Sequence, residues 1–133
     1  MRSDTRTVTI AAAPEAVLGF VADPANLPRW AIGFAKGVRR QDGRWVVSTG
    51  RGEVAVTVDV DERVGTVDFL MEPAPGVEAV AYSRVVPNGT GAEYVFTQFQ
   101  QPGTPDEVFG QLSDAVGHEL VALKALLEVV CPL

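Results

Sequence analysis

Residues 104–130 read TPDEVFGQLSDAVGHELVALKALLEVV, and this run determines the architecture of the chain. Thr104 and Glu107 have the spacing of a capping box, and Pro105 suits a first helical position, so a helix is predicted to begin here. It continues for about 25 residues to Val130, because no further proline interrupts it. At about 100° per residue, its apolar side chains gather on one broad face. The members of this face are Val108, Leu112, Val116, Leu120, Leu123, Leu126, Leu127 and Val130. Such a face is typical of a helix that lies along a sheet.

Residues 32–100, which precede this helix, are predicted to form strands joined by tight turns. Asp42-Gly43 and Asn88-Gly89 mark hairpins, because these residue types adopt positive φ at little cost. Two successive strands show clean alternation of apolar and polar residues. Their apolar faces carry Val54, Val56, Val58 and Val60 in one strand, and Val67, Phe69 and Met71 in the next. Hairpin links predict about six strands here, mostly antiparallel.

The N-terminal part predicts one strand and two short helices. Residues 5–10 alternate, Pro14 suits the start of a helix, and Asp23-Pro24 ends it. Residues 25–30 then form a second short helical turn. The expected fold is therefore α+β and a single domain of residues 1–133, with a curved antiparallel sheet of about seven strands. The two short helices precede most of the sheet, and the long C-terminal helix crosses its concave face.

Three short motifs accompany this element order. Val8-Thr9-Ile10 precedes Ala13-Pro14-Glu15, Asp23-Pro24 precedes Leu27-Pro28-Arg29-Trp30, and the last helix ends with residues 120–128. With these motifs the chain resembles the START-like (SRPBCC) superfamily, particularly its polyketide cyclase/dehydrase-type branch, over nearly its whole length. The resemblance implies a helix-grip fold with a deep, largely apolar pocket for a lipid, a polyketide or another hydrophobic small molecule.

Composition excludes several other classes of function. A net charge of −6 argues against a nucleic-acid-binding surface, which needs clustered Lys and Arg. No run approaches the 18 or so apolar residues of a membrane span, and no apolar stretch of signal-peptide length follows Met1. Cys131 and His118 are the only cysteine and histidine, so no zinc site and no cofactor are expected. We expect a cytoplasmic protein that is a monomer or a homodimer.

Glu119 is the one weak candidate for a catalytic residue, because it lies near the middle of the apolar helix face. A carboxylate there acts as a general acid or base, orients a ligand hydroxyl, or bends to the rim and pairs with an arginine such as Arg84. We favour the rim or ion-pair interpretation. His118 is expected to face solvent, about 130° from the centre of the apolar face.

The predicted ligand-binding side chains come from the loop after the short helices, from four strands and from the last helix. They are Trp30, Phe34, Val56, Phe69, Met71, Tyr82, Arg84, Tyr94, Phe96, Leu112, Val116 and Glu119. The inward faces of residues 77–86 and 92–100 stay open, because a shift of one residue reverses a strand. The alternative inward set contains Ala81, Ser83, Val95, Thr97 and Phe99.

The favoured function is binding of a hydrophobic small molecule between sheet and helix, with no metal. One alternative is a polyketide cyclase or dehydratase, although the sequence contains no catalytic motif. Another is a co-chaperone-like module that binds a protein partner. Among relatives in the superfamily that the chain resembles, some catalyse, some only bind or carry, and some act on proteins, so the resemblance alone does not choose.

Overall fold

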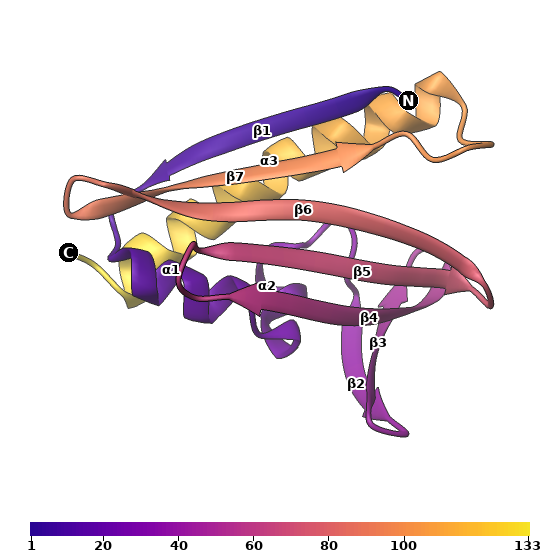
Figure 1. Ribbon diagram of the computed structural model, residues 1–133, viewed down its shortest axis with the longest axis horizontal. Helices are drawn as coiled ribbons and strands as arrows, with labels where there is room; N and C mark the ends of the chain where they lie inside the picture. The colour runs from indigo at the N-terminus through magenta and orange to yellow at the C-terminus, as the bar shows by residue number, and fades with distance from the viewer.

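The computed structural model describes residues 1–133 as one seven-stranded antiparallel sheet with its helices on one side (Figure 1). The elements are β1 (Ser3–Ile10), α1 (Pro14–Val21), the 3-10 turn η1 (Pro24–Asn26), α2 (Leu27–Trp30), β2 (Gly37–Gln41), β3 (Arg44–Thr49), β4 (Gly52–Asp61), β5 (Thr66–Ala74), β6 (Val77–Asn88), β7 (Gly91–Phe99) and α3 (Asp106–Val130). This arrangement confirms the predicted α+β fold class, with two short helices and one long C-terminal helix.

The strands follow the order β1-β7-β6-β5-β4-β3-β2. The first two strands in sequence therefore occupy opposite edges of the sheet. Because α1, η1 and α2 connect those edges, they must cross one face of the sheet, which we call the inner face. In Figure 1 these helices and α3 lie behind the sheet, and α3 follows β1 and β7.

The long helix α3 has the predicted 25 residues, but its start differs from the prediction. Pro105 occupies the N-cap and no side chain caps the helix, so the predicted capping box is wrong. Instead, the side-chain amide of Gln100 connects the end of β7 to the start of α3. It donates hydrogen bonds to Thr104 O at 2.7 Å and to Asp106 Oδ1 at 2.8 Å. Asp106 and Glu107 still place negative charge in the first turn, where it complements the helix dipole.

The buried stripe of α3 is narrower than the predicted face. Its members are Phe109, Ser113, Val116, Glu119, Leu120, Leu123 and Leu127. Apart from Glu119, they follow alternating steps of four and three residues, the period of a helix that packs along a single line. Leu112 lies about 100° from Ser113 and is 41% exposed, so its predicted place in the packed face is wrong.

Strand β6 settles which residues of the last two strands face the helices. Ala81, Ser83 and Val85 are buried on the inner face, whereas Tyr82 is 47% exposed and Arg84 is also exposed on the outer face. Small inward side chains on β6 leave room for the aromatic rings of its neighbours. Ala81 pairs with Phe69 of β5, and Ser83 pairs with Phe96 of β7.

The hairpin between β2 and β3 forms as predicted. Asp42 and Gly43 both have positive φ, at 53° and 75°, which is the geometry of a type I′ turn. This hairpin extends away from α3 in Figure 1, at the far edge of the sheet.

Candidate functional site

Four aromatic side chains meet on the inner face beneath α2. The ring of Trp30 lies 6.5 Å from Phe69 and 6.1 Å from Tyr94, measured between centroids, and its contact with Tyr94 is edge-on. Phe96 lies 6.2 Å from Phe69 and 6.5 Å from Tyr94. We call these four residues the aromatic cluster. All four were predicted site residues, and the fold brings them together from α2, β5 and β7.

Val56 and Val116 are also buried in the same core, from β4 and α3. Phe34 and Met71 are half-buried and pack against it. These four predicted site residues therefore belong to the same core as the aromatic cluster or pack against it.

Polar atoms without partners lie inside this apolar interior. The indole Nε1 of Trp30, the hydroxyl of Tyr94 and the amide Nε2 of Gln98 are buried and have no hydrogen-bond partner within the protein. Burial raises the pKa of the Tyr94 phenol, and the Glu119 charge adds to this effect, whereas the Ser83 hydroxyl opposes it. The Ser83 hydroxyl itself donates to Val67 O at 2.6 Å. Unpaired buried polar atoms are rare in proteins, so each calls for an explanation.

Glu119 enters this interior from α3. It is 5% exposed, and its Oε2 accepts hydrogen bonds from the backbone N–H groups of Gly33 and Phe34, both at 3.0 Å. Burial raises the pKa of Glu119 to about 7, although the two N–H groups and the charge of Lys36 lower it. The carboxyl group therefore changes charge near neutral pH.

The predicted rim position of Glu119 and its pairing with Arg84 are both wrong. Arg84 lies on the outer face, where its Nε donates to Val64 O at 2.9 Å. Tyr82 also points away from the aromatic cluster, and its ring packs edge-on against Phe99, 6.1 Å away. The register of β6 places the side chains of Tyr82 and Arg84 on the outer face of the sheet, which explains why neither lies at the predicted site. His118 is exposed, as predicted.

Gly33 is the site residue that the sequence did not reveal. A Cβ atom at this position would lie 3.2 Å from Ala115 Cβ and 3.4 Å from Glu119 Oε2, so the loop lies close against α3 and a side chain here would fit tightly. A lone glycine in a loop gives no hint of such contact, because the partner is 86 residues away.

Two hollows of the molecule lie outside the aromatic cluster, and neither is lined by α3, so neither is the predicted pocket between the sheet and this helix. One, of about 260 Å³, is an open hollow at the edge of the inner face. It is lined by Ala22, Pro24, Arg40, Gly43, Arg44, Trp45, Val56, Thr57 and Val58. The Arg40 guanidinium lies 4.9 Å from the centroid of the Trp45 ring.

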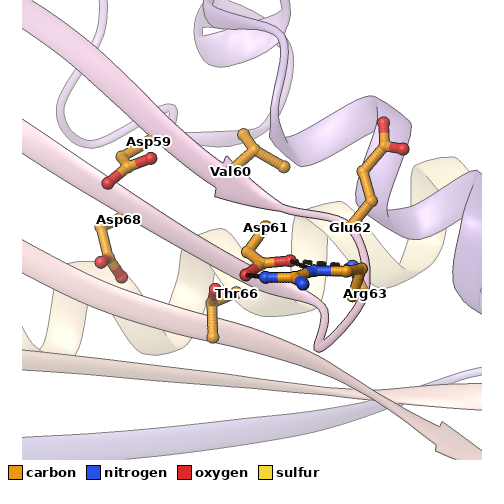
Figure 2. A pocket seen from close by; sticks show the side chains of 7 residues that line it. All are labelled: Asp59, Val60, Asp61, Glu62, Arg63, Thr66 and Asp68. Atoms are coloured by element: carbon orange, nitrogen blue, oxygen red, sulfur yellow. Dashed lines mark hydrogen bonds and ion pairs between the residues drawn. The ribbon is translucent and has the colours of Figure 1, made fainter.

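The larger hollow, of about 580 Å³, is an open and mainly acidic surface at the β4–β5 hairpin. Figure 2 shows Asp59 and Asp68 on neighbouring strands and the Asp61 carboxylate bonded to Arg63. Partial burial and the neighbouring Asp59 raise the pKa of Asp68. No set of three His, Cys, Asp or Glu side chains is arranged to hold a metal ion. None of the helices combines the length and the apolar character that crossing a membrane requires.

The seven-stranded sheet with two short helices and a long C-terminal helix is a START-like helix-grip fold. The chain belongs to the family described as "Polyketide cyclase / dehydrase and lipid transport", which matches residues 1–128. This result confirms the resemblance inferred from the sequence. The sequence has no significant match among curated proteins.

Solved structures with the same fold differ widely in sequence. The di-domain ARO/CYC BexL from the BE-7585A biosynthetic pathway is 20% identical, with a TM-score of 0.77 over 98% of this chain and 47% of its own. The Aha1 dimer from Colwellia psychrerythraea is 15% identical, with a TM-score of 0.75 over 97% of this chain and 98% of its own. A START superfamily protein from Mycobacterium smegmatis is 17% identical, with a TM-score of 0.73 over 96% and 98%. At these identities the likeness establishes the fold alone.

Proposed function

We propose that the protein binds an apolar, oxygen-bearing small molecule, lipid- or polyketide-like, against the aromatic cluster. The observation that carries this proposal is a pair of buried polar groups in an apolar interior, Trp30 Nε1, which has no partner, and the Tyr94 hydroxyl, which forms no well-aligned hydrogen bond although Ser83 lies near it. An unsatisfied buried polar group costs about 1–3 kcal/mol, so stability alone does not account for them. A ligand oxygen that accepts from either group removes that cost.

The proposed ligand contacts follow from the inner face. They are Trp30, Phe34, Val56, Phe69, Met71, Tyr94, Phe96, Val116 and Glu119. The ring faces and aliphatic side chains contact the apolar body, while the buried polar atoms select its oxygen. The family description, which includes lipid transport, supports a carrier of this kind.

The test uses two probes that differ by one carbonyl group, tetralin and 1-tetralone. Native mass spectrometry of freshly purified protein first shows whether a ligand co-purifies. Calorimetric titration then measures both probes. One hydrogen bond of about 1–1.5 kcal/mol predicts roughly tenfold tighter binding of the ketone.

The two tyrosines provide a matched pair of variants. Tyr94→Phe should reduce the preference for the ketone, whereas Tyr82→Phe, on the outer face, should leave it unchanged. The two tryptophans provide a second pair of variants. Trp30→Phe should reduce the preference for the ketone, whereas Trp45→Phe should leave it unchanged. If neither probe binds and nothing co-purifies, the proposed function is wrong.

A second candidate function is a cyclase or dehydratase, favoured by the pKa of about 7 at Glu119 and by its electrostatic coupling to the Tyr94 phenol. A carboxyl group poised near neutral pH exchanges protons efficiently as a general acid or base. With a β-keto substrate that the wild type converts, Glu119→Gln should abolish turnover and spare binding. Unchanged turnover in this variant would remove Glu119 from the mechanism.

The proposed compartment is the cytoplasm, in keeping with the free thiol of Cys131. The Aha1 dimer shows that this fold occurs as a dimer. Light scattering after size-exclusion chromatography distinguishes a monomer from a homodimer here.

A further inference from the structure

The segment between α2 and β2, residues 31–36, is joined to α3 by a single side chain. We call this segment the 31–36 loop. Two successive backbone N–H groups, of Gly33 and Phe34, donate to one oxygen of Glu119. The Phe34 N–H also donates to Ala31 O at 3.0 Å, so only the Gly33 N–H has Glu119 as its sole acceptor. The other hydrogen bonds of the loop are local turns or hold its ends, such as Ala31 N to Leu27 O at 2.8 Å and Lys36 N to Ser48 O at 2.7 Å. The middle of the loop therefore depends on Glu119 for its attachment to the helix.

One side of the loop lies on the core that carries the aromatic cluster. Ala31 and Ala35 are buried and Phe34 is half-buried, and all three belong to or pack against the same hydrophobic core. Trp30, which precedes the loop, contacts both Phe69 and Tyr94. Displacement of the loop would thus expose the aromatic cluster to solvent.

The outer side of the loop presents apolar side chains to solvent. Ile32, next to Gly33, is 48% exposed. Leu112, 41% exposed, precedes Glu119 by seven residues and so lies two turns earlier on the same side of α3. One exposed apolar side chain beside this contact and another two turns away on α3 are suited to an entrance for an apolar molecule.

We propose that Glu119 and the amides of Gly33 and Phe34 form a proton-controlled latch, and that opening of the 31–36 loop admits ligand to the aromatic cluster. The admission of ligand rests on the function proposed above. The latch itself does not, because it is a property of the loop and the helix alone.

The direction of control follows from the surroundings of the carboxyl group. The charged and titratable groups near it are Lys36 on the loop and Tyr94 on β7. His118, its neighbour on α3, is exposed, and Arg6 of β1 is engaged by Asp4 and Asp114. None of these outweighs burial, which raises the pKa of Glu119 to about 7 in the closed structure although the loop's own N–H groups and Lys36 lower it.

Opening the loop returns the carboxylate to water, where its pKa falls toward 4.5, its ordinary value. The closed form therefore binds the proton more tightly. By linkage, a rise in pH through 7 favours opening and a fall favours closure. A difference between 4.5 and about 7 limits the change in the opening equilibrium to roughly 300-fold.

Amide hydrogen exchange tests the latch directly in the full chain. NMR follows the Gly33 amide, which Glu119 alone accepts, between about pH 5.5 and 8.5, with rates corrected for intrinsic chemical exchange. The Phe34 amide is a second reporter, partly protected by its bond to Ala31 O. Protection in the wild type should fall by up to roughly 30-fold as pH rises from about 5.5 to above 7, and then level off, because the linkage acts between the pKa values of the open and closed forms. Glu119→Gln should remove this dependence on pH. Protection that stays constant in the wild type overturns the proposal without any variant.

Glu128 provides a matched control on the same helix. Its Oε2 also accepts a backbone N–H across the fold, from Ala11 at 2.8 Å, but Lys124 lowers its pKa. Protection of the Ala11 amide should therefore show no transition near pH 7. A parallel transition at Ala11 would mean that the whole fold loosens, and the latch would be rejected.

The ligand measurement separates this proposal from the proposed function. Stopped-flow mixing with 1-tetralone should give an association rate constant that rises with pH in the wild type and stays flat in Glu119→Gln. A constant rate in the wild type contradicts gating, even if binding occurs. If 1-tetralone fails to bind at every pH while the amides respond, the proposed function fails and the latch stands.

Discussion

The ionisation of Glu119 sets a measurable dependence of folding stability on pH. Its pKa rises from 4.5 to about 7 on folding because the side chain is buried. The neutral form is thus favoured in the folded state, and its stabilisation is fully present below pH 4.5 and lost as pH rises through 7. A shift of this size, at about 1.4 kcal/mol per unit, corresponds to about 3 kcal/mol.

Glu119→Gln isolates this contribution, because its amide oxygen still accepts from Gly33 and Phe34 without carrying a charge. Urea unfolding of both proteins should be measured between about pH 4.5 and 8. The free energy of unfolding of the variant, relative to the wild type, should increase across this range by up to about 3 kcal/mol. All other titrating groups cancel in the difference.

A difference that stays flat from pH 4.5 to 8 would refute this reasoning, since Glu119 would then ionise equally in both states. Glu128→Gln controls for a general effect of removing a carboxylate from α3. Lys124 and the Ala11 amide lower the pKa of Glu128, so its stabilisation is present above its ordinary pKa and lost only in more acidic solution. This control should show no change between about pH 6 and 8.

Two further predictions concern single positions. Tyr94→Phe removes a buried hydroxyl that has no partner, so the free energy of unfolding in urea should stay the same or increase by about 1 kcal/mol. A decrease of more than about 2 kcal/mol would mean that the hydroxyl is hydrogen-bonded inside the fold. Gly65→Ala should cost more than Gly43→Ala by over about 1 kcal/mol in thermal or urea unfolding. Both glycines have positive φ, but only at Gly65 would a Cβ lie 2.4 Å from Val85 O, and equal losses would contradict the close approach.

The fold could be predicted because its decisive elements carry local patterns. Residues 106–130 repeat apolar side chains at helical spacing over 25 residues, and tertiary packing has no need to override that pattern. Asp42-Gly43 specifies a turn by its own backbone preferences. From Val54 to Val60 a valine occupies every second position, so only one register buries the valine face.

The site was predicted less completely because its deciding features are not local. In β6 apolar residues occur at both parities, so alternation could not tell Ala81 and Ser83 from Tyr82 and Arg84. The pairing of Ser83 with Phe96 settles the matter, and that pairing involves another strand. Likewise, Glu119 is bound by backbone N–H groups, which every loop residue except proline possesses and which leave no mark in the sequence.

The unfavourable features of the core are concentrated at one place, where the 31–36 loop, α3 and β7 meet. Burial of Glu119 costs about 3 kcal/mol at a pH where it is ionised, which equals the burial of one or two leucine side chains. Leu120, Leu123 and Leu127, fully or almost fully buried on the same helix, more than offset this cost. A core selected for stability alone would gain from an apolar residue at Glu119 and from phenylalanine at Tyr94. Because the fold retains both polar groups in its core, the proposed binding role accounts for their position better than packing does.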